Sequence, residues 1–276
     1  PPRSTLFPYT TLFRSLHEDG TEQWYDEKAP IGELIGDNIA VYFALDFSGS
    51  MDEITPGGNG STRLANQKTA MFAVLEYLKD LLSYGHLKNL DIKVVGYGCQ
   101  TDDFRWPSPT KYGATASDIN AIKTWYNNLT LLSAYRYTYF PMGVTDAPDF
   151  FSGADPEARR ISIFLTDGTP TFSTGNLGTD EEKLTIAGDA RAILDTVSDL
   201  VMHAFNIDLD NPTYTNFMDN TMDDNQEDGD VPVLFGGDSQ GIKDAIIAAL
   251  FGRFDMNPAH IIRECLTEPG DRKSVV

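Results

Sequence analysis

The stretch Ala44–Asp52, "ALDFSGSMD", decides the fold because an apolar strand pattern ends there in a polar cluster. Residues 38–45, "NIAVYFAL", form a short apolar run rich in β-branched and aromatic side chains, which is typical of a buried strand. Asp46, Ser48 and Ser50 occupy alternate positions, so in extended backbone their side chains point to the same side. The glycine between the serines lets the chain turn tightly. The stretch therefore predicts a strand end that gathers oxygen atoms at one point.

Outward from this stretch, strand and helix patterns alternate along the chain. Apolar residues recur at helical spacing in four segments: 61–85, 115–129, 180–200 and 239–252. Strand-like runs occupy four others: 91–98, 159–168, 201–208 and 230–237. Strands separated by helices favour an open, mostly parallel sheet covered on both faces. The sequence thus predicts a doubly wound α/β fold, a three-layer sandwich whose ligands bind outside the carboxyl ends of the strands.

Two further polar positions are expected at the same edge of the sheet. Thr166-Asp167-Gly168 ends a later apolar strand, and Thr138 comes just before an expected helix start. Because the carboxyl ends of parallel strands share one edge, Asp167 can reach the point defined by Asp46. The resulting set contains hydroxyl and carboxylate oxygens without nitrogen or sulfur. Such hard ligands suit Mg²⁺, Mn²⁺ or Ca²⁺ rather than zinc or copper.

The three motifs together resemble the metal-ion-dependent adhesion site (MIDAS) of von Willebrand factor A (VWA) domains. They are "DFSGS", the threonine of "TYFPMGV" and "LTDG", and the resemblance extends in element order over roughly residues 37–253. It implies that a divalent metal, Mg²⁺ or alternatively Mn²⁺ or Ca²⁺, is held by five residues: Asp46, Ser48, Ser50, Thr138 and Asp167. It also implies that the serines bind the metal directly, and that the threonine and aspartates bind directly or through water. A partner protein would then supply an acidic group to the under-neutralised cation.

Composition excludes several other classes of function. The chain has 41 acidic and 21 basic residues, a formal net charge of −20, so binding to nucleic acid through a basic patch is not expected. Anionic membranes would repel it, and no apolar run approaches the roughly 18 residues of a membrane helix. The two cysteines, Cys99 and Cys265, are far apart and indicate neither a disulfide framework nor a zinc site.

The ends of the chain do not read like the rest. Residues 1–15 and 271–276 are similar to translations of a short sequencing adapter in opposite orientations. Codons for Thr10–Ser15 can be chosen so that their reverse complement, after one base is dropped, encodes residues 271–276. We expect both segments to be artefacts without ordered structure, and the natural chain to be a fragment. The remainder is then divided into an N-terminal extension at 16–36, the VWA-type domain at 37–253 and the start of a further segment at 254–270.

A short stretch after the last helix suggests a wider context. Residues 257–269, "NPAHIIRECLTEP", resemble part of the tail-tip and baseplate-hub proteins of tailed bacteriophages, although Asn257-Pro258 also suits the start of a plain helix. This resemblance implies a component of a phage tail, located in the virion tail or outside the cell.

Two readings connected with enzymes remain as alternatives to a non-enzymatic binding domain. In the first, the domain docks onto a separate motor as a subunit of a magnesium-chelatase-like or other ATPase complex. In the second, "GDSQG" at 237–241 is the nucleophile elbow of a serine hydrolase, with Ser239 as nucleophile and partners such as Asp255 and His260. The chain after Ser239 is too short for the strands that usually carry such partners, so we expect Ser239 to cap the last helix.

Overall fold

The structure of the chain is a computed structural model, and it describes the greater part of the sequence. The described residues are 12–16, 22–26, 37–54, 60–99, 105–131, 138–168, 170–171, 179–207, 233–234 and 239–251. No helix among them combines the length and apolar character needed to cross a membrane.

A six-stranded sheet in the order β5-β4-β3-β6-β7-β8 forms the centre of the molecule. Its strands are β3 (Asp37–Asp46), β4 (Leu87–Tyr97), β5 (Arg105–Pro107), β6 (Arg159–Thr166), β7 (Leu200–Ile207) and β8 (Val233–Leu234). All neighbouring strands are parallel except β4 and β5, which pair antiparallel at one edge. The mostly parallel sheet predicted from the sequence is confirmed.

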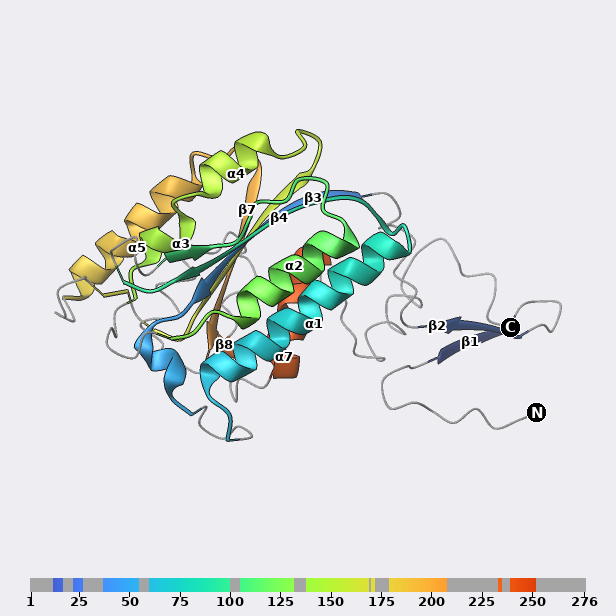
Figure 1. Cartoon of the computed structure of the whole chain (residues 1–276), viewed down its shortest axis with the longest axis horizontal. Coiled ribbons are helices and arrows are strands. Elements are labelled where there is room, and N and C mark those ends of the chain that lie inside the picture. The colour runs from blue at the N-terminus through green and yellow to red at the C-terminus, as the bar shows by residue number, and fades with distance from the viewer. Residues whose placement is uncertain are drawn as a thin grey trace, which may run out of the picture.

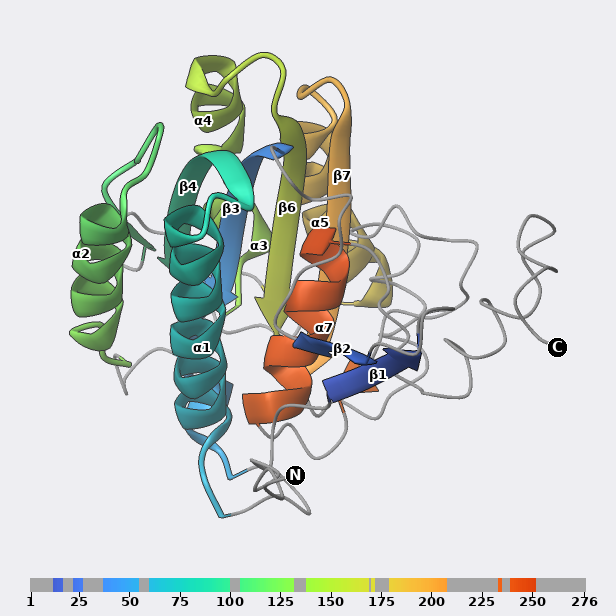
Figure 2. The ribbon, with the colours of Figure 1, turned by 90° about the vertical axis from the view of Figure 1, so that its right-hand side faces the viewer.

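Helices cover both faces of this sheet (Figures 1 and 2). On one face lie α1 (Arg63–Ser83), α2 (Ala116–Asn127) and α7 (Ser239–Phe251). On the other lie α3 (Phe140–Val144), α4 (Ala147–Gly153) and α5 (Asp180–Leu194). The molecule is therefore the three-layer α/β sandwich that alternating strands and helices predict.

The central strand β3 contributes alternate side chains to two hydrophobic cores, one on each face of the sheet. Ile39, Val41, Phe43 and Leu45 join the core beneath α1, α2 and α7, whereas the side chains between them join the core beneath α3, α4 and α5. Every one of these residues is fully buried. A strand buried on both faces has no polar side to alternate with, which explains the continuous apolar run in the sequence.

Threonine side chains begin three of the helices. Thr62 accepts a hydrogen bond from the backbone at the start of α1, while Thr115 and Thr179 form capping boxes with Asp118 and Glu182 at α2 and α5. These caps satisfy backbone N–H groups that lack partners within the helix.

Several element boundaries differ from those expected. The helix expected over 180–200 ends at Leu194, because the chain turns before β7 and Asp199 adopts a left-handed conformation with φ of 56°. The strand expected over 230–237 is limited to Val233–Leu234 among the described residues. The short antiparallel strand β5 is not predicted by the sequence pattern.

A separate two-stranded antiparallel sheet joins β1 (Leu12–Leu16) to β2 (Glu22–Asp26). Strand β1 includes residues for which the sequence analysis expects no ordered structure.

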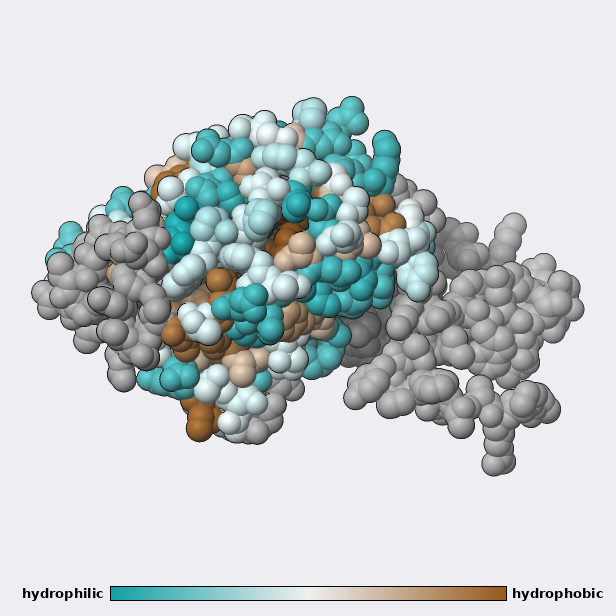
Figure 3. Space-filling view, in the orientation of Figure 1, coloured by the Kyte–Doolittle hydropathy of each residue, from teal (hydrophilic) through white to brown (hydrophobic). Residues whose placement is uncertain are grey.

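Large apolar side chains are exposed at few of the described positions. They are Ile54, Tyr84, Tyr112, Leu184 and Val201. The face in Figure 3 is mainly hydrophilic, with apolar residues scattered among polar ones. Such isolated apolar residues are normal on a protein surface.

Candidate metal centre

The candidate site lies where the strand order reverses. β3 pairs with β4 on one side and with β6 on the other, although β6 comes much later in the chain. In open α/β sheets, ligands bind outside the carboxyl ends of the strands at such a switch point. Asp46 is the last residue of β3, and Asp167 directly follows β6. The two predicted carboxylates therefore lie at the place where this fold forms binding sites.

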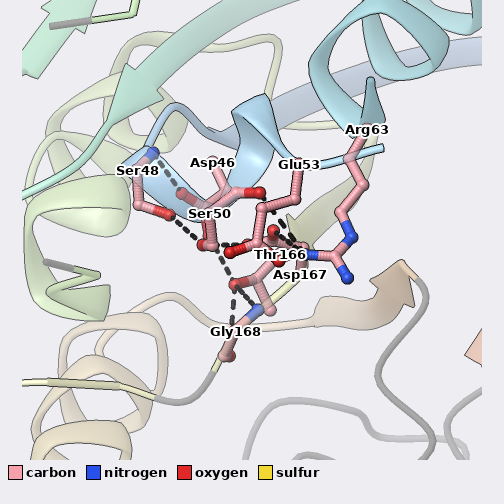
Figure 4. Close-up of polar contacts among 8 residues, drawn as sticks. All are labelled: Asp46, Ser48, Ser50, Glu53, Arg63, Thr166, Asp167 and Gly168. Atoms are coloured by element: carbon pink, nitrogen blue, oxygen red, sulfur yellow. Dashed lines mark hydrogen bonds and ion pairs between the residues drawn. The ribbon is translucent and has the colours of Figure 1, made fainter. Parts of the chain in front are cut away.

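The loop after β3 brings its two serines together. The neighbouring side chains Phe47 and Met51 are buried in the core, which anchors the loop. Asp46 accepts a hydrogen bond on Oδ1 from the backbone N–H of Ser48, at 2.7 Å. The hydroxyl oxygens of Ser48 and Ser50 lie 3.0 Å apart (Figure 4). The two hydroxyls converge as expected, but Ser50 lies in the 3-10 helix η1 (Gly49–Asp52), so a turn and not extended backbone brings them together.

Asp46 is fully buried and is held from three directions. Its Oδ2 accepts a hydrogen bond from Thr166 Oγ1 at 2.6 Å, and its backbone carbonyl accepts one from Gln67 Nε2 at 3.1 Å. Burial raises the pKa of Asp46, and the hydrogen bonds from Thr166 and Ser48 oppose that shift. Both carboxylate oxygens are therefore engaged, so Asp46 orients its neighbours from beneath the loop.

Asp167 connects the β6 loop to the serines. Ser50 Oγ donates to its Oδ1 at 2.8 Å, and Arg63 Nη1 donates to its Oδ2 at 3.0 Å (Figure 4). Burial and then the nearby charge of Asp46 raise the pKa of Asp167 to about 7, against the lowering effect of Ser50 and Arg63. Two buried carboxylates are costly to ionise next to each other, so a cation bound between them would stabilise their charged forms.

Thr138 enters the same place from a third loop. A methyl group on Gly168 would lie 3.5 Å from Thr138 Oγ1 and 3.7 Å from Ser50 Oγ, so both hydroxyls border the space that this glycine leaves open. The backbone of Thr138 donates to Thr171 Oγ1 and accepts from the Thr171 N–H, both at 2.8 Å. These two bonds fasten the Thr138 loop to the chain that follows Asp167.

The donor chemistry and the spacing fit a small hard cation. Adjacent oxygens around Mg²⁺ bound at about 2.1 Å lie about 3 Å apart. The separations Ser48–Ser50 and Ser50–Asp167 are 3.0 and 2.8 Å, which suits neighbouring ligands of one octahedral ion. Among the described residues, no group of three or more His, Cys, Asp or Glu side chains could hold a metal. The candidate centre therefore depends on hydroxyls beside two carboxylates.

Four contributing residues are absent from the predicted set of ligands. They are Arg63, Gln67, Thr166 and Thr171. The role of Gln67 could have been suspected from the sequence, because this polar residue lies among apolar residues on the face of α1 that is buried. The role of Arg63 could have been suspected because it is a cation at the first position of a helix, where the helix dipole disfavours positive charge.

The other residues singled out in the sequence do not belong to this site. Ser239 is the first residue of α7 rather than a residue before it. Its supposed partners Asp255 and His260, the phage-like stretch 257–269 and Cys265 fall outside the described residues. Cys99 is buried, and it forms no disulfide with another described residue.

The fold and the oxygen-lined switch point define the class: a doubly wound α/β domain with a candidate cation site. No protein-family model and no curated sequence matches the chain. Among solved structures, the pilus adhesin SpaC from Lactobacillus rhamnosus GG is similar, with a TM-score of 0.57 and 15% identity over 76% of this chain and 30% of SpaC. Its open conformation gives 0.54 and 14% over 76% and 29%.

A third similar structure is the vWF domain of the type V pili tip protein Mfa5 from Porphyromonas gingivalis. Its TM-score is 0.49 at 11% identity, over 69% of this chain and 88% of that domain. The chain spans less than a third of the length of SpaC. At these identities the likeness to SpaC is one of fold alone, and it agrees with the doubly wound α/β architecture predicted from the sequence.

Proposed function

We propose that this chain is a protein-binding domain of the adhesion type whose binding depends on a divalent cation. Ser48, Ser50 and Thr138 would hold the ion through hydroxyl oxygens, with Asp46 and Asp167 supplying charge and orienting hydroxyls or water. Mg²⁺ is the expected ion, and Mn²⁺ or Ca²⁺ would share the oxygen ligands. A bound ion would supply a positive centre that an acidic group of a partner protein completes.

One observation carries the proposal. The oxygens of Ser48, Ser50 and Asp167 form a continuous chain, with separations of 3.0 and 2.8 Å, at the switch point of the sheet. Three separate loops contribute, because Thr138 borders the same space beside Gly168. Hydroxyls outnumber carboxylates, so a divalent ion there would keep an affinity for one more acidic ligand.

The domain would form part of a larger assembly. The fold likeness to a pilus adhesin supports an extracellular adhesive role for such a domain, and SpaC is a much longer chain than this one. The resemblance of residues 257–269 to phage tail-tip proteins points instead to a virion tail, and it stays a prediction. In an extracellular adhesin or in a virion tail, the candidate metal centre would bind the partner protein in the same way.

The direct test measures thermal stability with Mg²⁺ and with EDTA. We expect Mg²⁺ to raise the melting temperature of the wild-type protein and to leave that of Ser48→Ala unchanged. Removing one ligand hydroxyl takes away a direct contact to the ion, whereas the fold keeps its core. The absence of any effect of Mg²⁺, Mn²⁺ or Ca²⁺ on the wild-type protein would remove the basis of the proposal.

Ser239→Ala is the matched control for the same substitution. We expect it to respond to Mg²⁺ as the wild-type protein does, because Ser239 lies at the start of α7. The same variant tests the hydrolase alternative. Ester hydrolysis by the wild-type protein that disappears in Ser239→Ala would favour an enzyme over a binding domain.

A further inference from the structure

Arg63 occupies an unusual position for a cation. It is the first residue of α1, no acidic residue lies in the first turn, and its side chain is almost completely buried. Positive charge at a helix N-terminus is disfavoured by the helix dipole, and burial adds a desolvation cost. Something outside the helix must therefore stabilise the guanidinium there.

The acidic loops at the candidate metal centre provide that stabilisation. Arg63 Nη1 lies 3.0 Å from Asp167 Oδ2, 3.3 Å from Glu53 Oε2 and 3.3 Å from the backbone carbonyl of Ser50 (Figure 4). One nitrogen thus contacts the carboxylate of one proposed ligand residue and the backbone of another. The pair with Asp167 is shielded from solvent on both sides, so salt screens it weakly.

We propose that Arg63 is a built-in counter-cation of the metal centre, which weakens the binding of the divalent ion and makes the loaded site one charge more positive than it would be without this arginine. This inference rests on the proposed function. Asp46, Asp167 and Glu53 bring three formal negative charges, so a divalent ion alone would leave the loaded site at −1, and Arg63 brings it to zero. The positive charge that Arg63 adds favours a partner that brings a carboxylate, and Arg63 cannot lose this charge by deprotonation.

A purely positioning role for Arg63 predicts the opposite result. If the guanidinium served only to hold Asp167 in a productive orientation, its removal would weaken metal binding. If it competes with the ion for Asp167, its removal strengthens metal binding. The sign of the change in affinity therefore separates the two roles.

The experiment measures the dissociation constant of Mn²⁺ alone by electron paramagnetic resonance. We expect Arg63→Gln to bind Mn²⁺ about tenfold more tightly than the wild-type protein, since a unit charge within several Å of a divalent ion repels it by that much even at water-like dielectric. Arg63→Lys retains the charge and should stay within about twofold of wild type. Arg191→Gln removes an arginine from an ion pair on the surface of α5 and should also stay within about twofold, because salt screens exposed charges.

A second measurement, of the melting temperature, does not require the dissociation constant of Mn²⁺. In EDTA, Arg63→Gln should melt at a lower temperature than the wild-type protein, because Asp167 loses its ion-pair partner. Saturating Mn²⁺ should then raise the melting temperature of Arg63→Gln by more than it raises that of wild type. Arg63→Met, which keeps the apolar length of the side chain, replaces Arg63→Gln if the latter does not fold.

The outcomes separate this inference from the proposed function. Mn²⁺ binding by wild type together with equal or weaker binding by Arg63→Gln overturns the role of Arg63 and leaves the metal centre standing. Binding by Arg63→Gln and not by wild type supports the inference in its strongest form. The absence of binding in all variants overturns both.

Discussion

Asp91, in the central sheet, and Asp167, directly after strand β6 of that sheet, are both buried, at 1% and 2% exposure, but their carboxylates have different partners. Asp91 lies in β4 and accepts hydrogen bonds from the backbone N–H groups of Gly113 at 2.7 Å and Asp155 at 2.8 Å. A third comes from Asn89 Nδ2 at 3.2 Å. All three donors are neutral, and two belong to the backbone. This carboxylate therefore ties two loops to the strand.

Asp167 has a hydroxyl and an arginine as partners, with a second buried carboxylate nearby. Ser50 Oγ can rotate to another acceptor, and Arg63 is shared with Glu53. The charge of Asp46 raises the pKa of Asp167, in addition to the effect of burial. The comparison shows that burial alone does not indicate a binding site. The site is the place where buried carboxylates are paired with hydroxyls and with each other.

The largest loss of stability is expected for a substitution of Asp91. Asp91→Asn should lower the free energy of unfolding by about 3 kcal/mol, because the amide NH₂ would face a buried N–H group and leave it without an acceptor. Chemical denaturation in EDTA measures the loss. The folded variant should bind Mn²⁺ with the affinity of wild type, and a loss below about 1 kcal/mol would contradict the account of Asp91.

Asp167→Asn should behave in the opposite way. In EDTA we expect a change of less than about 1 kcal/mol, because the substitution removes an ion pair but also a desolvated charge beside Asp46. With Mg²⁺ at about 100 times its dissociation constant, wild type should gain about 2.7 kcal/mol and the variant nothing. Denaturation with and without Mg²⁺ gives both numbers. Equal gains would show that Asp167 does not contribute to metal binding.

The pH dependence sharpens the contrast. Because the pKa of Asp167 is raised to about 7 in the folded state, the folded protein holds a proton that the unfolded chain has released. The associated stability is complete below pH 4 and is lost as the pH rises through about 7, by at most about 1.4 kcal/mol per pH unit for one proton. Unfolding in EDTA from pH 5 to pH 8 should show this fall in wild type.

Two comparisons test the origin of that fall. It should be much smaller in Asp167→Asn, which has no proton to release at this position. Saturating Mg²⁺ should also reduce it, because the ion binds the deprotonated carboxylate. Identical slopes in wild type and Asp167→Asn would assign the pH dependence to other groups.

The parts of the site that the sequence predicts are those defined by strand geometry. Asp46, Ser48 and Ser50 follow from the alternation of side chains at the end of a strand, and Asp167 follows from the shared edge of parallel strands. The contact between Ser50 and Asp167 agrees with the second argument. Ser50 approaches Ser48 because it lies in the 3-10 helix Gly49–Asp52, which the alternation argument does not predict. Whether they bind a metal stays a prediction.

The parts that the sequence does not predict depend on contacts between distant segments. Arg63 reaches Asp167 across 104 positions of the chain, and the packing of α1 against the sheet decides that contact. Strand β5, at Arg105–Pro107, is too short for its pattern to be recognised and contains proline, which is suited to an edge. The fold class is therefore more predictable than the groups that tune the site.

The smallest expected effect concerns the attachment of the Thr138 loop. Thr171→Val keeps the shape of the side chain but removes the hydroxyl that accepts the Thr138 N–H at 2.8 Å. The free energy of unfolding should fall by about 1 kcal/mol, because a buried N–H loses its partner. Mn²⁺ should bind about threefold more weakly, since Thr138 is held less firmly beside Ser50.

Thr185→Val is the matched control on α5, where the threonine hydroxyl donates to the Glu181 carbonyl at an exposed position. It should change stability by less than about 0.5 kcal/mol and leave Mn²⁺ binding unaltered. If Thr171→Val and Thr185→Val bind Mn²⁺ equally well, the Thr138 loop needs no attachment to the β6 loop. Thr138 would then contribute to the centre less than the two serines, which the loop after β3 holds next to Asp46 and Asp167.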